Sequence, residues 1–476
     1  MSDSTTAKST VPGASVDEVL PMGRLSTLGL QHVMVMYAGA VAVPLIIGDA
    51  LGLTKEQITI LINADLLCCG LITLIQAWGV GIFGIRLPVM MGVSFAAVTP
   101  MIAIGTNPEL GLTGIFGACI LAGLFSILIS PVFSRLMGLF PPVVTGTIIT
   151  VIGVTLMRVG LDWVGGGRPM IPDATGQMIP NPEYGSFENL AIAFTVLVII
   201  LFITKYARGF LANVAVLIGL VAGFLISLAM GRISFEGISE ASWVAVVTPF
   251  YFGMPTFNFG AAAVISLIMI VIMVESLGMF IALGEICEKP PTRKDLVRGL
   301  RTDGLGTLVG GILNTFPHSS FSQNVGLVSV TGVRSRWVCV MGGFFLIALG
   351  LFPKMAFVVA SIPLYVLGGA GIVMFGMVAS TGIKILLSAD LNTNRHNPYI
   401  IAISLGFGMI PLVAEHLFVQ LPEALAPLLH SGILLAAVSA IVLNLFFNGM
   451  QPVTKAAPQK KTVETNTETP VAAQQS

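Results

Sequence analysis

Charged residues, cysteines and nucleotide-binding motifs are scarce in this sequence, and each shortage argues against a class of protein. Only 10% of the 476 residues are charged and the net charge is zero, so no overall field favours nucleic acid as a partner. No phosphate-binding P-loop is present, so ATP is not the evident driving force. The five cysteines lie mostly in apolar stretches and, like His396, His416 and His430, show no ligand spacing, which predicts neither a metal site nor a disulfide framework.

Apolar residues, by contrast, make up 55% of the chain, and the mean hydropathy is +0.94. These values indicate an all-α polytopic membrane protein with lipid as its surroundings. Hydropathy over a sliding window predicts about fourteen membrane-spanning segments. Their centres lie near Met36, Leu67, Phe95, Leu124, Ile152, Leu197, Leu217, Ile270, Leu308, Gly326, Phe345, Val373, Leu405 and Val438.

The distribution of basic residues predicts the orientation of these segments. If the segments alternate, most of the 23 basic residues fall in one set of loops together with both tails. The other set holds only Lys55, Arg158, Arg168, Arg232 and Lys354. Because the loops rich in lysine and arginine face the cytoplasm, we expect an even number of spans and cytoplasmic tails. The tails, residues 1–24 and 449–476, have the composition of disordered chain.

A faint internal repeat suggests how the segments are organised. The pattern Pro141-x-x-Val144-x-Gly146 of the fifth segment recurs as Pro363-x-x-Val366-x-Gly368 in the twelfth. The third segment is interrupted by Pro88, Gly92 and Pro100, and it falls a similar distance ahead of the tenth. Two halves of seven spans must be inverted relative to each other, and broken segments at matching places point to a transporter's substrate site.

The tenth segment, Phe316–Gly332, is too short and too polar to span a bilayer as a regular helix. Pro317 lacks an amide donor, and Gln323 and Asn324 would be costly against lipid. Irregular polar backbone at membrane depth is tolerated where it lines a cavity within the protein. We therefore expect half-helices or short strands in segments 3 and 10, with Gln323 and Asn324 in the wall of a binding site.

Glu275 lies near the middle of the eighth segment, where a carboxylate normally faces a cavity or a partner. One interpretation is a hydrogen-bonded glutamate that locks helices together. The other is a ligand contact, because a carboxylate accepts two parallel N–H bonds from a planar molecule and Gln323 offers both an acceptor and a donor. Together they suit a flat heterocycle with alternating donors and acceptors.

Ser94 and Phe95 occupy the break in the third segment. Half-helices that meet there and near Gln323 would direct free amides into the cavity, and their positive ends would favour an acidic ligand. Phe95 could stack on a ring, although a phenylalanine in an apolar segment is more often plain core.

His32 and Asp303 are the other notable buried ionisable candidates. Intramembrane carboxylates and histidines commonly relay protons, but both residues fit equally well as fixed hydrogen-bond partners. Asp65 is interpreted as structural, and we expect His318 to cap the broken tenth segment.

Several of these residues carry a resemblance to a known family. Gln323-Asn324-Val325-Gly326 followed by Thr331-Gly332 is similar to the signature of the nucleobase–ascorbate transporter family, and Gln31-His32 resembles its first-segment motif. Glu275 and Asp303 fall where that family carries acidic residues. The runs around His32 and Gln323 look like those of the bacterial uric acid and xanthine permease branch. Val325, where many xanthine permeases have a second asparagine, favours the urate side.

The resemblance implies a fold of seven plus seven inverted spans in two domains. Spans 1–4 (residues 25–137) and 8–11 (258–352) would form a core domain, and spans 5–7 (138–257) and 12–14 (353–448) a gate domain. It further implies a homodimer in the bacterial inner membrane and proton symport by an elevator-like movement, with no cofactor besides the proton. Glu275 and Gln323 would bind the purine, Ser94, Phe95 and Asn324 would complete the site, and His32 and Asp303 would support coupling.

Other functions remain open at this point. A uracil or other nucleobase symporter differs from a purine symporter mainly in pocket volume. An inorganic-anion carrier of the same fold is disfavoured because Glu275 would repel an anion. An enzyme would need a nucleophile and base, and Ser319 or Ser320 beside His318 follows no known catalytic pattern.

Overall fold

The architecture is described from a computed structural model that covers residues 15–172, 177–414, 416–421 and 426–450. The first half of the chain contains α1 (Met22–Leu51), α2 (Lys55–Trp78), β1 (Met91–Val93), η1 (Phe95–Ala97), α3 (Val98–Gly105), α4 (Gly111–Leu136), η2 (Met137–Leu139), α5 (Pro142–Val164), β2 (Met170–Pro172), β3 (Met178–Pro180), α6 (Phe187–Tyr206), α7 (Phe210–Asn213) and α8 (Ala215–Ala229).

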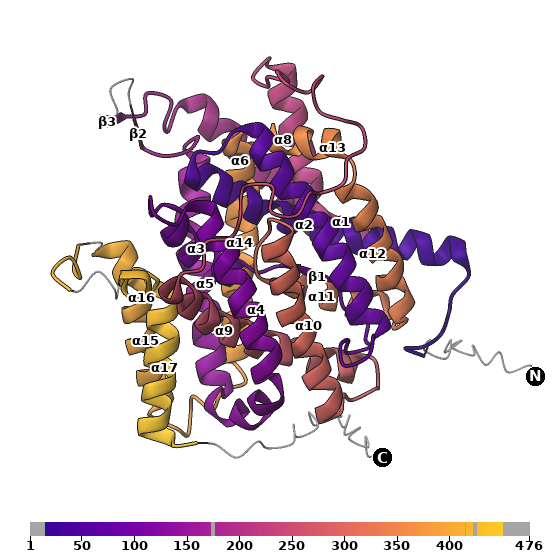
Figure 1. The fold of residues 1–476 in the computed structure, drawn as a ribbon, viewed down its shortest axis with the longest axis vertical. Coiled ribbons are helices and arrows are strands. Elements are labelled where there is room, and N and C mark those ends of the chain that lie inside the picture. Colours follow the sequence, from indigo (N-terminus) through magenta and orange to yellow (C-terminus); the bar gives the residue numbers. More distant parts are fainter. Residues whose placement is uncertain (1–14, 173–176, 415, 422–425, 451–476) are drawn as a thin grey trace, which may run out of the picture.

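The second half contains α9 (Phe259–Ile286), α10 (Arg293–Ile312), β4 (His318–Ser320), α11 (Ser322–Thr331), α12 (Arg336–Gly350), α13 (Pro353–Ala360), α14 (Leu364–Leu386), α15 (Asn397–Val413), α16 (Ala426–Leu429) and α17 (Gly432–Asn448). The longer helices run through the molecule side by side, and β1 and α11 lie in its interior (Figure 1).

Seven of the described helices are long and apolar enough to cross a membrane, or eight if the bent pair α12–α13 counts as one span. All fourteen predicted centres fall within helices, including η1 for Phe95 and α11 for Gly326. However, α8, α15 and α17 are only 15–17 residues long, and the first half of α10 carries several charges. A polytopic helical membrane protein is therefore confirmed, whereas the count of fourteen spans stays a prediction.

The two helices that carry the repeated proline–glycine pattern pack against each other in opposite directions. Pro141 and Pro363 are the N-cap residues of α5 and α14. Gly146, near the start of α5, lies against Gly382 near the end of α14, and Gly368, near the start of α14, lies against Val164 at the end of α5. A Cβ at either glycine would come within 3.0 Å of the opposite backbone, so the glycines allow this close approach.

Residues 15–24 correct the predicted boundary of the N-terminal tail, because they are ordered and α1 already begins at Met22. Val16 is buried, and its carbonyl accepts the backbone N–H of Arg336. Asp17 forms ion pairs with Lys289, at 2.9 Å, and Arg336, at 2.7 Å. These partners lie about 270 residues or more away in the sequence, so composition alone did not reveal them. Residues 1–14 and 451–476 lie outside the described residues.

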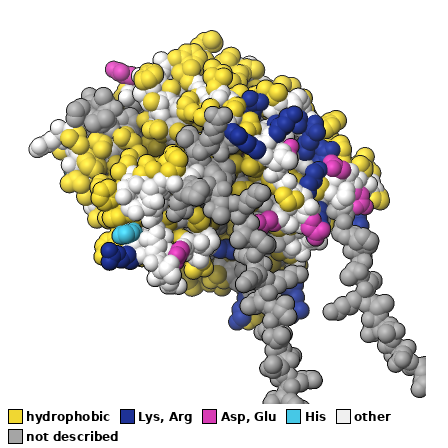
Figure 2. Space-filling model, turned by 90° about the horizontal axis from the view of Figure 1, so that it is seen from below, with side chains coloured by type: hydrophobic (Ala, Val, Ile, Leu, Met, Phe, Trp, Pro, Cys, Tyr) yellow, Lys and Arg dark blue, Asp and Glu magenta, His cyan; other side chains and the backbone are white. Residues whose placement is uncertain are grey.

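The face seen from below in Figure 1 carries a group of lysine and arginine side chains beside a largely apolar surface (Figure 2). Acidic side chains are interspersed with them. A basic surface of this kind at one end of a bundle of apolar helices is typical of a membrane protein.

Candidate functional site

Two interrupted segments cross at the centre of the molecule through a pair of short antiparallel strands. In β1 and β4, Met91 lies opposite Ser320 and Val93 lies opposite His318. The bonds continue beyond the strands, since the N–H of Ser94 donates to the carbonyl of Pro317 at 2.8 Å and that of Phe321 donates to Met90 at 2.9 Å. Each segment thus satisfies backbone groups of the other, which removes the penalty for irregular chain inside the molecule.

A threonine hydroxyl on a neighbouring helix supports the start of each strand. The N–H of Met91 donates to Thr73 Oγ1 of α2 at 2.9 Å, and the N–H of His318 donates to Thr307 Oγ1 of α10 at 3.2 Å. The ring of Phe321 then fills the space beside the crossing. A Cβ added to Gly39 of α1 or to Gly92 of β1 would lie 2.5 Å from this ring, so both positions require glycine.

Glu275 lies in α9, which packs against η1, β4 and α11. Its side chain is half-buried, and among the described residues no hydrogen bond or ion pair of its carboxylate is found. The helix therefore brings an available acceptor next to both interrupted segments. This arrangement disfavours the interpretation of Glu275 as a lock between helices, since a lock requires a partner.

Gln323 is exposed and lies in the first turn of α11. The N-cap residue of this helix is Phe321, which supplies no side-chain cap, so the first amides of α11 have no side-chain acceptor. Within the described residues, Gln323 Oε1 accepts a bond from the neighbouring Ser322 hydroxyl at 3.2 Å. An exposed amide at an uncapped helix start can bind a ligand with alternating donors and acceptors.

His318 does not cap α11, so that expectation is wrong: the strand bonds of β4 and the ring bond to Phe316 hold it three residues before the N-cap.

Ser94 and Phe95 lie at the corresponding place in the other segment. The hydroxyl of Ser94 accepts the N–H of Ala96 at 3.3 Å, so η1 is capped by its own side chain, in contrast to α11. Phe95 is half-buried, and its ring meets that of Phe375 from α14 edge to face, with 5.9 Å between centroids. Phe95 therefore has both a core contact and an accessible portion.

Asn324 joins the second interrupted segment to α1. Its Nδ2 donates to the carbonyl of His32 at 2.9 Å and lies 3.0 Å from His32 Nδ1. If Nδ1 accepts this bond, the neutral imidazole carries its proton on Nε2. Both side chains are buried. The pair fixes the position of α11 relative to α1, and whether His32 also carries a proton stays a prediction.

Asp303 is fully buried on α10. Its Oδ1 lies 3.5 Å from Gln76 Nε2, and Oδ2 has no hydrogen-bond partner among the described residues. Gln76 also accepts the N–H of Ile85 and donates to the carbonyl of Gly299, so it connects α2, α10 and the chain between α2 and β1. The carboxyl group of Asp303 is thus held at one oxygen and unpaired at the other.

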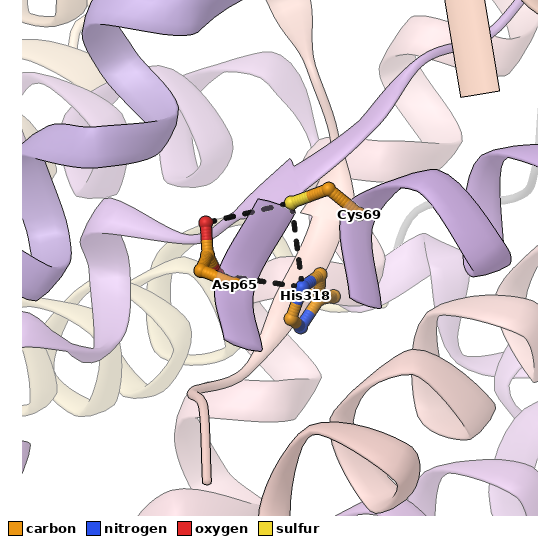
Figure 3. Close-up of side chains that lie close together, drawn as sticks. All are labelled: Asp65, Cys69 and His318. Carbon is orange, nitrogen blue, oxygen red and sulfur yellow. Dashed lines mark hydrogen bonds and ion pairs between the residues drawn. The ribbon is translucent and has the colours of Figure 1, made fainter. Parts of the chain in front are cut away.

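A third polar cluster, which the sequence did not predict as a unit, contains Asp65, Cys69 and His318 (Figure 3). One ligand atom of each lies within 4.8 Å of the others, close enough for a metal ion. Protein partners already surround these atoms, since Thr315 donates to Asp65 at 2.8 Å and His318 Nδ1 lies 2.7 Å from the carbonyl of Phe316. We therefore interpret the cluster as a hydrogen-bond network. The only local signal was the spacing of Asp65 and Cys69, which places both on one helix face.

A cavity of about 460 Å³ lies elsewhere, at the C-terminal end of α1. Its polar lining comes from Asp49, Lys55, Arg232, Ser234 and Ser361. None of the residues predicted to bind a ligand lines it. The interrupted segments remain the better candidate. α11 has no side-chain cap, and α9 brings next to both segments the carboxylate of Glu275, which is unpaired among the described residues.

Comparison with known proteins agrees with the resemblance seen in the sequence. Residues 23–417 match the family model described as "Permease family". The chain is 57% identical to the uric acid transporter UacT of Escherichia coli (strain K12), over 92% of this chain and 89% of that protein. It is 44% identical to a xanthine permease of Bacillus subtilis (strain 168), over 90% and 94%.

Among solved structures, the transmembrane domain of the cyanobacterial bicarbonate transporter BicA has a similar fold. The TM-score is 0.58 at 16% identity, with 90% of this chain and 99% of that chain covered. At this identity the likeness concerns the fold alone.

Proposed function

The chain belongs to the nucleobase–ascorbate transporter family, and from this premise we propose that it takes up oxidised purines, uric acid or xanthine, across the bacterial inner membrane. It is a membrane permease and not an enzyme. Relatives that are 44–57% identical carry the names of uric acid and xanthine transporters. The observation that carries the proposal is the unpaired carboxylate of Glu275 on a helix that packs against both interrupted segments.

The chemistry of an oxidised purine suits these groups. Its rings carry N–H donors and carbonyl acceptors along their edges, so Glu275 would accept N–H bonds at one edge while Gln323 donates and accepts at another. The uncapped start of α11 favours an acidic ligand, which urate is. Phe95 would stack on the ring, Ser94 would contribute backbone contacts, and Asn324 would hold α11 in place.

The pattern of contacts between helices supports fourteen spans in two inverted halves, because helices of the first half and their counterparts in the second half make equivalent contacts. If α1, α2, α4, α5 and α6 correspond to α9, α10, α12, α14 and α15, then the contact of α4 with α10 becomes that of α12 with α2. Likewise the contact of α6 with α14 becomes that of α15 with α5. In the pairs β1–β4 and α5–α14, each element packs against its own counterpart in the other half. Both pairs are antiparallel, as a two-fold axis in the membrane plane requires.

The same contacts support a proposed division into a core and a gate. We assign residues 25–137 and 258–352 to the core and residues 138–257 and 353–448 to the gate, with the interrupted segments in the core and α5–α14 at the centre of the gate. The contact of Phe95 with Phe375 would join the two. An elevator-like movement of the core against the gate, a homodimer and cytoplasmic termini complete the proposal, and the basic face in Figure 2 supports the orientation.

Proton coupling is proposed for the driving force, with no other cofactor. His32 and Asp303 would support it, since both are buried ionisable groups next to the site. Asp303 has one carboxyl oxygen that is unpaired among the described residues and is therefore the better placed of the two to gain or lose a proton without breaking an existing bond.

Uptake of radiolabelled urate and xanthine in cells tests the proposal. Glu275→Gln and Gln323→Ala should each lower uptake and raise KM, whereas Gly406→Ala, on α15 at a position with open space around it, serves as the control. Wild-type affinity in both variants would refute the assignment of these side chains. Collapse of the pH gradient should abolish accumulation, and dependence on sodium would refute proton coupling.

Two alternative substrates are compared with this proposal. A uracil or other nucleobase symporter would use the same groups, and competition by unlabelled purines and pyrimidines separates the two. An inorganic-anion carrier is suggested by the fold shared with the bicarbonate transporter BicA. The unpaired carboxylate of Glu275 disfavours it, because a negative charge in the site repels an anion that offers no N–H donors.

A further inference from the structure

Asp65, Cys69 and His318 form a buried polar cluster at the junction of α2 and β4, outside the candidate binding groups (Figure 3). Asp65 is 1% exposed, and Cys69 and His318 are fully buried. Nε2 of His318 lies 3.5 Å from Asp65 Oδ1 and 3.5 Å from Cys69 Sγ. Cys69 Sγ also lies 3.5 Å from Asp65 Oδ2.

The hydrogen bonds of the imidazole ring fix which nitrogen faces Asp65. Nδ1 lies 2.7 Å from the carbonyl of Phe316, and a carbonyl can only accept, so Nδ1 carries a proton. A neutral ring then presents the lone pair of Nε2 to the carboxyl group. Two acceptors facing each other at this distance inside the protein are unfavourable unless a proton lies between them.

A count of donors and acceptors leads to the same requirement. The cluster contains three acceptor atoms, namely the two carboxyl oxygens of Asp65 and Nε2 of His318. Two donors are present, because the hydroxyl of Thr315 donates to Oδ1 and the thiol of Cys69 donates to Oδ2. One acceptor remains, and one additional proton satisfies it. That proton also neutralises the single negative charge of the cluster.

We propose that Asp65 and His318 share one proton and form a proton-binding site of the transport cycle, distinct from Glu275, His32 and Asp303. The proposal rests on the proton-coupled function proposed above. The position of the pair explains how the proton acts. His318 is the first residue of β4 and lies opposite Val93 of β1, and Gln323 follows five residues later. The shared proton therefore joins α2 to the strand crossing that carries the candidate binding groups.

The surroundings of the pair contain few other titratable groups. The face of α2 contributes the thiols of Cys68 and Cys69, and Cys68 lies 3.7 Å from the carbonyl of Gly306. On α10, Gly306 and Gly310 pack on His318, while β1 has no titratable side chain. Asp303 on α10 and Glu275 on α9 are the nearest carboxyl groups of the helices that pack on β4, and no contact of either with the pair is found in the described residues.

The test counts protons taken up when urate binds to the purified full-length protein in a weakly buffered solution, at a series of rising pH values. Uptake occurs only at a pH where the ligand-free protein has lost the shared proton, and urate binding restores it. Asp65→Asn and His318→Gln each place a fixed amide N–H between the two side chains, so a hydrogen bond between positions 65 and 318 is kept while the titratable proton is lost. Thr315→Val is the matched control, because it removes a donor to Asp65 and leaves the pair able to share its proton.

As the pH rises, uptake by the wild type and Thr315→Val should increase toward about one proton per urate bound, and both amide variants should bind urate with little or no proton uptake. In vesicles, these variants should exchange labelled urate and fail to accumulate it against a gradient. An unchanged proton count in both amide variants would overturn the shared-proton site while leaving the proposed function intact. Absence of proton uptake in the wild type at every pH of the series would refute proton coupling itself. Elemental analysis that finds a bound metal, lost in both amide variants, would also overturn the proposal.

Discussion

The two interrupted segments have the same plan and differ in polarity. In the first arm, residues 91–105, a strand leads into η1 and α3, and in the second arm, residues 318–331, a strand leads into α11. The two strands pair with each other, and a threonine hydroxyl accepts the backbone N–H of the first residue of each strand. Ser94 caps η1 in the first arm, which continues with mostly apolar residues. In the second arm, α11 has no side-chain cap and carries Gln323 and Asn324 in its first turn.

This difference indicates that the two arms contribute different interactions to ligand binding. In the first arm the hydroxyl of Ser94 is engaged in capping η1 and the residues around it are apolar, so this arm contributes mainly shape, backbone and the ring of Phe95. The second arm has an exposed amide and an uncapped helix start, so it contributes the hydrogen bonds that distinguish one ligand from another. Glu275 lies on α9, which contacts both arms.

The largest expected effect comes from removing the polar group of the second arm. Gln323→Ala should weaken urate binding about 10- to 100-fold, because hydrogen bonds to an acidic ligand contribute roughly 1.5–3 kcal/mol. Ser94→Ala in the first arm should lower stability by about 1 kcal/mol through loss of a cap, with little change in affinity. Calorimetric titration with urate measures the affinity of both variants, and equal losses of affinity would contradict different roles of the two arms in binding.

A smaller effect should follow from disturbing the packing between the arms. A methyl group at Gly92 would lie 2.5 Å from the ring of Phe321, so Gly92→Ala should destabilise the protein by about 1–3 kcal/mol. In the second arm, a Cβ added to Gly326 would meet no atom within 4 Å, so Gly326→Ala should be neutral or slightly stabilising. The midpoints of thermal unfolding in detergent distinguish the stabilities of these two variants. A tolerated Gly92→Ala would show that the crossing is looser than described.

The aromatic contribution of the first arm should be smaller still. Phe95→Leu keeps the apolar volume and removes the ring, so affinity should fall only a few-fold, in line with about 0.5–1.5 kcal/mol for an aromatic pair. The binding constants of the variant and the wild type for urate provide the measurement. A loss as large as that of Gln323→Ala would assign recognition to the first arm as well.

The smallest expected effect concerns the anchoring of the second arm to the N-terminal segment. Hydrogen bonds from Lys289 and Arg336 hold the pKa of Asp17 below its ordinary value, and Arg336 begins α12 directly after the second arm. A carboxylate whose pKa is lower in the folded protein stabilises the fold at pH values above its unfolded-state pKa, near 3.8. This contribution is lost as the pH falls through the pKa of the folded state. Because the pair is largely exposed, Asp17→Asn should cost less than about 1 kcal/mol at neutral pH.

Thermal midpoints of Asp17→Asn and the wild type should therefore differ slightly at pH 7 and converge below about pH 4. High salt should reduce the difference at pH 7, since exposed ion pairs are screened. A difference that grows as the pH falls would contradict a lowered pKa of Asp17 in the folded protein.

The sequence was sufficient to predict the features that depend on local pattern. Hydropathy located the helices, and Pro88, Pro317 and the polar pair Gln323-Asn324 indicated where two segments are interrupted. The repeated pattern at Pro141 and Pro363 marked the starts of two helices, α5 and α14, whose packing against each other the pattern did not predict. These predictions succeeded because proline and buried polar groups restrict the backbone wherever they occur.

Pairings between distant residues could not be predicted in the same way. Cys69 and His318 are 249 positions apart, and nothing near either residue indicates the other. The ordering of residues 15–24 likewise depends on Arg336 and Lys289, so their polar composition suggested a disordered tail. Asn324 was predicted to shape the site, but its bond to the carbonyl of His32 follows only from the packing of α11 on α1.

The decisive measurement is a structure of the purified protein with urate bound. We expect planar density between the two arms, with ring N–H groups on the Glu275 carboxylate and a ring edge on the Gln323 amide. Density in the cavity lined by Asp49, Lys55 and Arg232, with the space between the arms filled by side chains, would contradict a binding site at the strand crossing.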